Sequence, residues 1–298
     1  VSVRSLVPRC GDDLEFTLTI QFIEKEKPMG KIYQALERAE YHDEEPPKQS
    51  PASIFDLDPT NELVVLGKPG SAIAEQFRFL RSVITRPTQC AVPKTILVTS
   101  AMQGEGKSFT AANLAVTIAQ GLDEFVLLVD ADLRNPQLHR IFGVPDQGEK
   151  GLSTHLSEGE PLERLLRKTS IEKLTVLPAG NSASNPAELL VSAKMKAFIS
   201  EVRDRYPDRI VVFDSPPTEL APESLVMANE VDGVFMVVRR ATTPRELVKT
   251  TLEKFQREKF MGLIFNADKG LSKKYSGYKK NSKKYGYGYG YGCSYEKG

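Results

Sequence analysis

Short apolar runs alternate with longer amphipathic stretches from about Leu63 onward. Such runs fit strands that are buried on both faces, and the stretches between them are long enough to form covering helices. The alternation is typical of a doubly wound α/β fold, in which helices cover both faces of a mostly parallel sheet. The predicted strands are residues 95–100, 125–130, 174–178, 209–214, 233–238 and 262–266.

Two helix starts are marked by a capping residue, a proline and an acid. Proline is favoured in the first turn of a helix, and an acid three residues after the N-cap completes a capping box. The two sites are Asn185-Pro186 with Glu188 and Thr243-Pro244 with Glu246. A further helix is expected from the stretch FTAANLAVTIAQ, which begins at Phe109.

The main domain is flanked by segments of different character. Met29 opens an amphipathic stretch that the preceding residues do not resemble, and we hypothesise that it is the natural start. The predicted organisation is a non-native or disordered extension at 1–28, an amphipathic helix at 29–40, a Pro- and acid-rich linker at 41–62, the main α/β domain at 63–268 and a disordered Tyr-rich tail at 269–298.

Composition points to an ordinary soluble protein outside the tail. The chain is 40% hydrophobic and 27% charged, with a net charge of +1. It has no apolar run of about 18 residues, so we expect neither export nor a membrane span. Cys10, Cys90 and Cys293 are isolated, which argues against a disulfide framework or a paired-cysteine metal site and fits a cytoplasmic protein.

A phosphate-binding loop is predicted at SAMQGEGKS, residues 100–108, directly after a strand and before a helical stretch. In this Walker A context backbone N–H groups cradle nucleotide phosphates, Lys107 bridges the β and γ oxygens, and Ser108 holds Mg²⁺. Ala101 replaces the usual first glycine, but the groups that do the binding are present. The expected nucleotide-binding residues are Gln103, Gly104, Glu105, Gly106, Lys107, Ser108 and Phe109.

Carboxylates follow two other predicted strands. Asp130 and Asp132 lie two residues apart, so in extended geometry both would face the phosphates and Mg²⁺. In the alternative interpretation they are loop carboxylates paired with Arg134. Asp214 follows the strand at 209–214, where a Walker B carboxylate holds Mg²⁺ through its water shell. Together the three strand ends predict an ATP and Mg²⁺ site at one edge of the sheet.

The C-terminal segment is rich in tyrosine, glycine and lysine. Its alternating Tyr-Gly sequence and its charge of about +7 oppose folding. Mobile phenols could accept phosphoryl groups, but a sticky low-complexity linker or a platform for single-stranded nucleic acid is also open. The candidate phosphoacceptors are Tyr275, Tyr278, Tyr285, Tyr287, Tyr289, Tyr291 and Tyr295.

The charged residues of EQFRFLR, Glu75, Arg78 and Arg81, would lie along one side of a helix. Seen alone, they fit a solvated face with a local ion pair. Together with GEGKS, VLLVDADLR, IVVFDSPP and the tyrosine cluster, they give a sequence that resembles the bacterial tyrosine kinases (BY-kinases) of polysaccharide export, from about Ile73 to the C-terminus. In that family the E-x-x-R-x-x-R pattern is an oligomerisation motif.

The resemblance implies an ATP-dependent autokinase that regulates exopolysaccharide polymerisation and export. Each subunit of a ring would present its tail to the active site of a neighbour. The implied roles are phosphate stabilisation by Lys107, Mg²⁺ binding by Ser108, Asp130 and Asp214, and orientation or deprotonation of the phenol by Asp130 or Asp132. Asn266 resembles a position that contacts adenine in related ATPases, although a strand-end cap is equally open.

The resemblance also implies partners. Family members of this form depend on a separate transmembrane chain-length regulator, which would hold the kinase at the inner face of the cell membrane, and on a phosphotyrosine phosphatase. The helix at 29–40 could dock this regulator, or it could simply pack on the domain. Nucleic acid is not an expected partner.

Two alternatives belong to other functional classes. A MinD/ParA-like ATPase switch is disfavoured, because Met102 stands where those proteins carry a signature lysine and because they have no use for a tyrosine tail. A nucleotide-gated scaffold would bind nucleic acid or anionic lipid through its basic tail without phosphoryl transfer.

Overall fold

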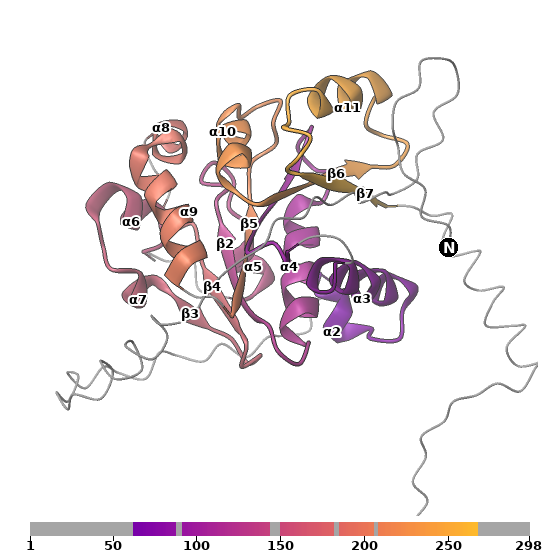
Figure 1. Ribbon diagram of the computed structural model, residues 1–298, viewed down its shortest axis with the longest axis horizontal. Helices are drawn as coiled ribbons and strands as arrows, with labels where there is room; N and C mark the ends of the chain where they lie inside the picture. The colour runs from indigo at the N-terminus through magenta and orange to yellow at the C-terminus, as the bar shows by residue number, and fades with distance from the viewer. Residues whose placement is uncertain (1–61, 88–90, 144–149, 182–184, 206–207, 268–298) are drawn as a thin grey trace, which may run out of the picture. The chain divides into compact units, whose positions relative to one another are not determined.

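The computed structural model describes residues 62–87, 91–143, 150–181, 185–205 and 208–267 (Figure 1). The predicted extension at 1–28, the helix at 29–40, the linker up to residue 61 and the tail at 269–298 lie outside these residues. All the described helices and strands belong to one unit of the chain, which ends at Asn266.

A seven-stranded sheet forms the centre of this unit, in the order β3-β4-β2-β5-β1-β6-β7. Neighbouring strands are parallel except for the β3–β4 pair. The strands are β1 Thr95–Ser100, β2 Phe125–Asp130, β3 Arg167–Lys168, β4 Leu174–Leu177, β5 Arg209–Asp214, β6 Gly233–Arg239 and β7 Phe260–Asn266. All six predicted strands and the doubly wound α/β fold class are therefore confirmed. β3 was not predicted, because its two residues are too few to produce a pattern.

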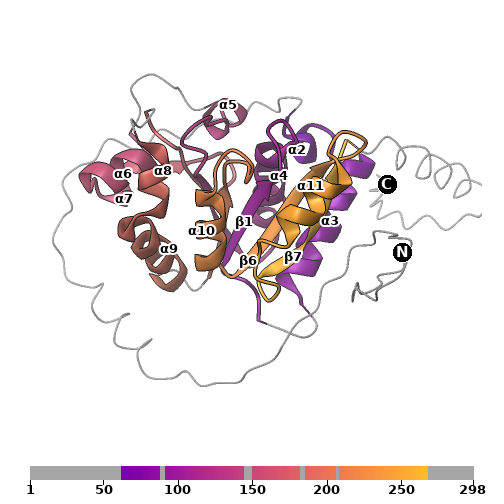
Figure 2. The same ribbon diagram turned by 90° about the horizontal axis from the view of Figure 1, so that it is seen from above.

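Helices cover both faces of the sheet (Figure 2). They are α2 Val64–Gly67, α3 Ala72–Thr85, α4 Lys107–Ala119, α5 Leu138–Ile141, α6 Leu152–Glu158, α7 Leu162–Leu165, α8 Pro186–Val191, α9 Ala193–Arg205, α10 Glu223–Glu230 and α11 Arg245–Leu252. The predicted start of α8 is confirmed, with Asn185 as N-cap and Pro186 in the first turn, but the Asn185 side chain makes no capping hydrogen bond, so the expected capping box does not form.

The predicted start of the helix after Thr243 is wrong by one residue. Pro244 is the N-cap of α11, and the helix begins at Arg245. The physical reason is that the Thr243 hydroxyl does not cap the helix. It donates instead to the Glu105 carboxylate, and its oxygen accepts from the Arg239 N–H at 3.2 Å.

Alternation along the strands divides the core into two layers. Ile96 and Val98 of β1 pack with α2, α3, α4 and α5 on one face of the sheet. Leu97 between them packs with α6 to α11 on the other face, as does Phe213 of β5. Because both faces are covered, β1 is buried along its whole length, which explains why successive residues at its centre, Ile96, Leu97 and Val98, are all apolar.

The Asn113 side chain of α4 is hydrogen-bonded to the backbone at the start of α2 and just before it. Its side-chain amide donates to the Glu62 carbonyl at 2.7 Å and the Phe109 carbonyl at 2.9 Å, and its side-chain oxygen accepts from the Val65 N–H at 3.2 Å. This buried amide therefore satisfies backbone groups of α2 and the segment before it, and it connects them to the helix that follows the phosphate loop.

Replacing Asn113 with alanine is expected to lower the free energy of unfolding by about 1–3 kcal/mol, because it leaves buried backbone groups unpaired. Chemical denaturation measures this loss. Asn229→Ala, at an exposed position of α10, is the matched control and should change stability by no more than about 0.5 kcal/mol. Equal effects of the two substitutions would contradict this role of Asn113.

Candidate active site

The carboxyl ends of β1, β5 and β2 meet at one edge of the sheet. The three strands are consecutive neighbours, and all run in parallel. Asp214 at the end of β5 is the register partner of Asp130 on β2 and of Val98 on β1. The structure therefore brings the three predicted strand ends together, at the place where ligands bind in open α/β sheets.

The phosphate loop depends on glycine at two positions. Gly104 and Gly106 have φ angles of 81° and 91°, in the left-handed region that favours glycine. A Cβ atom on Gly106 would lie 2.0 Å from the Asn266 Nδ2 atom. α4 begins at the next residue, Lys107, so its free N–H groups form the end of the loop. Such a helix N-terminus is suited to binding phosphate.

Lys107 contacts Asp132 directly. The Lys107 Nζ atom lies 2.6 Å from Asp132 Oδ2, and both side chains are buried. Burial lowers the pKa of Lys107, but the carboxylates of Asp214, Asp132 and Asp130 outweigh it and raise this pKa above its ordinary value. Lys107 is therefore positively charged, and the Lys107–Asp132 pair joins the phosphate loop to the loop after β2.

Asp130 is bound by backbone groups. Its Oδ2 atom accepts hydrogen bonds from the N–H groups of Gln137 and Leu138, at 3.1 and 3.0 Å, and its Oδ1 atom accepts from the Asp132 N–H at 3.2 Å. Complete burial and the nearby Asp214 carboxylate raise the pKa of Asp130 well above its ordinary value. In this arrangement Asp130 holds the loop that carries Asp132.

Asp214 is buried, and neither of its carboxylate oxygens has a hydrogen-bond partner. Burial raises its pKa to about 6, opposed by the positive charge of Lys107 and by the neighbouring Ser108 hydroxyl. A buried carboxylate without partners is unusual in a native protein. Among the described residues, no three His, Cys, Asp or Glu side chains gather into a metal-binding cluster.

Other predicted nucleotide-binding residues lie around this centre. Gln103 and Gly104 are exposed on the phosphate loop, whereas the Glu105 side chain is buried. The Phe109 ring packs against Phe77 of α3, with ring centroids 6.2 Å apart. Asn266 donates its side-chain amide to the Glu105 carbonyl at 2.8 Å, so the structure places it beneath the loop backbone.

Arg134 does not pair with the two aspartates before it, so that alternative interpretation is wrong. Its Nε and Nη2 atoms donate to Glu223 Oε1 at 2.9 and 2.8 Å. Glu223 is buried at the start of α10, so this pair joins the loop after β2 to the segment after β5. The sequence analysis missed Glu223, because no local pattern marks a contact between residues 89 positions apart.

The three charges predicted for oligomerisation lie on α3, but they have different surroundings. Glu75 and Arg78 form an exposed ion pair, and Arg78 also donates to the Pro69 carbonyl. Arg81 instead donates to the Thr117 carbonyl of α4 at 3.1 Å. Two large apolar side chains of α3, Ile73 and Phe79, are exposed at 51% and 47%.

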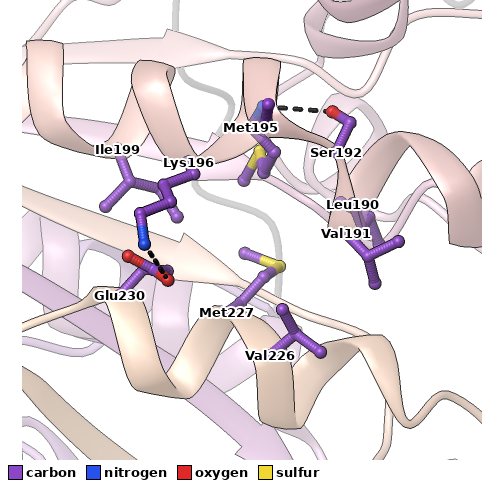
Figure 3. A pocket seen from close by; sticks show the side chains of 10 residues that line it. Leu190, Val191, Ser192, Met195, Lys196, Ile199, Val226, Met227 and Glu230 are labelled. Atoms are coloured by element: carbon purple, nitrogen blue, oxygen red, sulfur yellow. Dashed lines mark hydrogen bonds and ion pairs between the residues drawn. The ribbon is translucent and has the colours of Figure 1, made fainter.

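A separate groove lies between α8, α9 and α10 (Figure 3). It has a volume of about 280 Å³ and apolar walls that include Met195, Ile199 and Met227. Lys196 and Glu230 form an ion pair there with a distance of 3.0 Å. None of the strand-end carboxylates lines this groove, so it is distinct from the candidate active site.

Comparisons with known proteins agree with this geometry. Residues 91–267 match the family described as ParA: NUBPL iron-transfer P-loop NTPase. The tyrosine-protein kinase YwqD of Bacillus subtilis (strain 168) is 34% identical over 209 residues, which cover 70% of this chain and 86% of the relative. The tyrosine-protein kinase CpsD of Streptococcus agalactiae serotype III (strain NEM316) is 31% identical over 175 residues, or 58% of this chain and 74% of the relative.

A solved structure gives the same result. The crystal structure of the chimerical protein CapA2B2 matches with a TM-score of 0.62 and 32% identity, covering 72% of this chain and 93% of that one. The fold and site thus define a P-loop NTPase. The chain belongs to the bacterial tyrosine-protein kinase family, and its enzyme class is protein-tyrosine kinase. These relatives favour the kinase over the ATPase switch and the scaffold.

Within the described part of the chain, no helix is both long and apolar enough to cross a membrane.

Asp214→Asn is expected to stabilise the metal-free protein in a pH-dependent way. Because folding raises the pKa of Asp214 to about 6, the wild-type protein loses stability as the pH rises through that value. The asparagine variant avoids this loss. Its advantage should therefore grow between about pH 4 and 7, reach about 1–3 kcal/mol, and then stay constant.

Urea denaturation in the presence of a chelator, at a series of pH values, measures this advantage. Asp123→Asn, which changes an exposed loop carboxylate, is the control. If Asp214→Asn does not stabilise the protein, or stabilises it equally at every pH, then burial does not destabilise the ionised Asp214 carboxylate.

Proposed function

We propose that this chain is an ATP-dependent autokinase that transfers the γ-phosphoryl group of ATP to C-terminal tyrosines of a neighbouring subunit. Through this modification it would regulate exopolysaccharide polymerisation and export. The observation that carries the proposal is the contact of 2.6 Å between Lys107 and Asp132. This contact joins the cation of a phosphate loop to a carboxylate that can accept a proton. The similarity to named tyrosine-protein kinases supports the choice of acceptor.

Lys107 and Asp132 would act in sequence. Nucleotide phosphates at the N-terminus of α4 attract Lys107, and the Asp132 carboxylate is then released from its partner. Tyrosine has a pKa of about 10, so its phenol needs an acceptor for its proton at neutral pH. The phenol oxygen bonds to the γ-phosphorus and its proton moves to Asp132. The bond between the γ-phosphorus and the β–γ bridging oxygen breaks, and ADP leaves with that electron pair.

The residues around Asp214 fit Mg²⁺. A hard cation with a water shell prefers oxygen ligands, and two buried carboxylate oxygens here have no hydrogen-bond partner. The Ser108 hydroxyl neighbours them at the start of α4. Ser108 and Asp214 would hold the ion, which would neutralise charge on the phosphates. Asp130 would support this site by fixing the loop after β2, since three backbone N–H groups already occupy its carboxylate.

Transfer between subunits requires an oligomer, and α3 is the proposed interface. Glu75 and Arg78 are exposed on this helix, and the exposed Phe79 lies one turn after Glu75 on the same side. A face that combines apolar side chains with charges is suited to a second subunit. Arg81 would contribute indirectly, because its bond to the Thr117 carbonyl holds α3 on α4.

The remaining parts of the proposal rest on family resemblance. A separate transmembrane chain-length regulator would complete the active site and keep the kinase at the inner face of the cell membrane. A phosphotyrosine phosphatase would reverse the modification, and nucleic acid is not among the proposed partners. Asn266 would support the nucleotide site through its bond to the Glu105 carbonyl, in place of the expected contact with adenine.

A mixing experiment tests transfer between subunits. One variant, Lys107→Met, has acceptor tyrosines but lacks the phosphate-loop cation. The other has all seven tail tyrosines replaced by phenylalanine and keeps the active site. With ATP and Mg²⁺, phosphotyrosine should form on the Lys107→Met chain only when the two are mixed, as read by mass spectrometry.

Each variant incubated alone is the control. If the Lys107→Met chain remains unmodified in the mixture while the wild-type protein is phosphorylated, transfer occurs within one chain and the proposal is overturned. If the wild-type protein is also unmodified when a regulator fragment is supplied, autokinase activity itself is refuted.

Substitutions on α3 should separate assembly from stability. Arg78→Ala is expected to reduce oligomer formation with a change in unfolding free energy within about 0.5 kcal/mol, since its ion pair is exposed. Arg81→Ala should reduce both properties, because it removes the bond between α3 and α4. Sedimentation velocity of the unphosphorylated protein measures assembly. Arg86→Ala, at the end of the same helix, is the control, and sedimentation unchanged by all three substitutions would exclude this interface.

A further inference from the structure

The Glu105 side chain fastens the phosphate loop to a distant turn. Its Oε2 atom accepts from the Met102 N–H at 2.7 Å, within the loop itself. Its Oε1 atom accepts from the Arg239 N–H at 3.3 Å and from the Thr243 hydroxyl. Arg239 is the last residue of β6, and Thr243 lies in the connection between β6 and α11, so one buried carboxylate joins two segments more than 130 residues apart.

The chemistry of these contacts requires a carboxylate at position 105. Each of the two oxygens accepts a backbone N–H, from Met102 on one side and from Arg239 on the other. A glutamine at this position would place an NH₂ group against one of these donors, whichever way its amide is turned. The contacts therefore explain why a loop that binds anions carries an acidic residue.

Two further hydrogen bonds hold the backbone of the loop. The Arg239 Nη1 atom donates to the Gly104 carbonyl at 2.9 Å, and the Asn266 amide donates to the Glu105 carbonyl at 2.8 Å. Consecutive peptide units of the loop are thus held by the ends of β6 and β7. With their carbonyls fixed from that side, the orientation of the N–H groups in the same peptide units is fixed as well.

The supporting backbone has unusual conformations where it meets the loop. Ala241 and Ala267 have φ angles of 60° and 59°, and they are the two residues other than glycine with positive φ in the described part of the chain. Ala241 lies between Arg239 and Thr243, and Ala267 follows Asn266. The left-handed conformation costs a residue other than glycine about 1–2 kcal/mol. Such costs persist where the surrounding contacts determine the backbone, often at functional sites.

An open pocket of about 330 Å³ lies over this junction, lined by residues 102–105 of the loop and by Arg239, Thr242 and Thr243. The hydrogen bonds of Glu105 and Arg239 connect the two sides of this pocket.

We infer that Thr243 and Arg239 are positioning residues for nucleotide binding. They act through Glu105 and Gly104 and hold the phosphate loop in the conformation that receives phosphates. Neither residue belongs to the loop that was expected to bind nucleotide. The inference concerns nucleotide affinity, so it does not depend on the identity of the phosphoryl acceptor.

Nucleotide affinity of Thr243 variants tests the inference. Thr243→Val should raise the dissociation constant for ATP with Mg²⁺, measured by calorimetry, about fivefold to tenfold, the factor that corresponds to roughly 1–1.4 kcal/mol. Thr243→Ser keeps the hydroxyl and should restore the affinity. Thr250→Val is the matched control, because its hydroxyl is exposed and donates within α11 to the Leu247 carbonyl.

A double-mutant cycle tests the route through Glu105. Glu105→Gln should weaken ATP binding to a similar extent. In the Glu105→Gln background, Thr243→Val should then reduce the affinity for ATP by a smaller factor than it does in the wild-type background, because the two side chains share one interaction. Arg239→Met, which removes the bond to the Gly104 carbonyl, should weaken binding in its own right.

Circular dichroism and the thermal midpoint without nucleotide report whether each variant is folded. Wild-type ATP affinity in Thr243→Val would overturn the inference, as would an equal loss in Thr243→Ser or Thr250→Val. Strict additivity in the double-mutant cycle would overturn the route through Glu105. A change in affinity without any tyrosine phosphorylation would support the positioning role while refuting the proposed kinase reaction.

Discussion

Four buried ionisable side chains share one space at the ends of β1, β2 and β5. One of them, Lys107, is cationic, whereas the other three, Asp130, Asp132 and Asp214, carry carboxyl groups. Burial disfavours every unpaired charge, and the site can pair only part of its negative charge internally. The raised pKa values of Asp130 and Asp214 are the consequence. The charges of these four side chains therefore do not balance by themselves, and a cation that arrives with nucleotide phosphates would balance them.

The rest of the architecture keeps these groups in place. The parallel register puts Asp130 beside Asp214, and the backbone N–H groups after β2 hold the Asp130 carboxylate. Arg134 and the buried Glu223 join that segment to α10, while the ends of β6 and β7 support the phosphate loop from the other side. The contacts that position the site thus come from both sides of the central strands, from the segments after β2 and β5 and from the ends of β6 and β7.

Local patterns in the sequence predicted the elements and the reactive residues. Strands buried on both faces give continuous apolar runs, and the glycines and Lys107 of the phosphate loop are specific in that context. Long-range contacts left no such pattern. Thr243 was expected to cap a helix and instead binds Glu105, 138 residues away. Glu105 was expected to bind nucleotide, and no local pattern indicated that its carboxylate binds the end of β6 and the residues after it. The two-residue strand β3 gave no signal at all.

In the proposed reaction Lys107 leaves Asp132 and binds the phosphates of ATP. The freed Asp132 carboxylate then accepts the proton of the tyrosine phenol. The most direct measurement is the single-turnover rate of phosphotyrosine formation in Asp132→Asn, with the affinity for ATP measured on the same protein. The account predicts a rate at least about 100-fold below that of the wild-type protein, with ATP affinity unchanged or higher because Lys107 has lost its competing partner. An undiminished rate would contradict it.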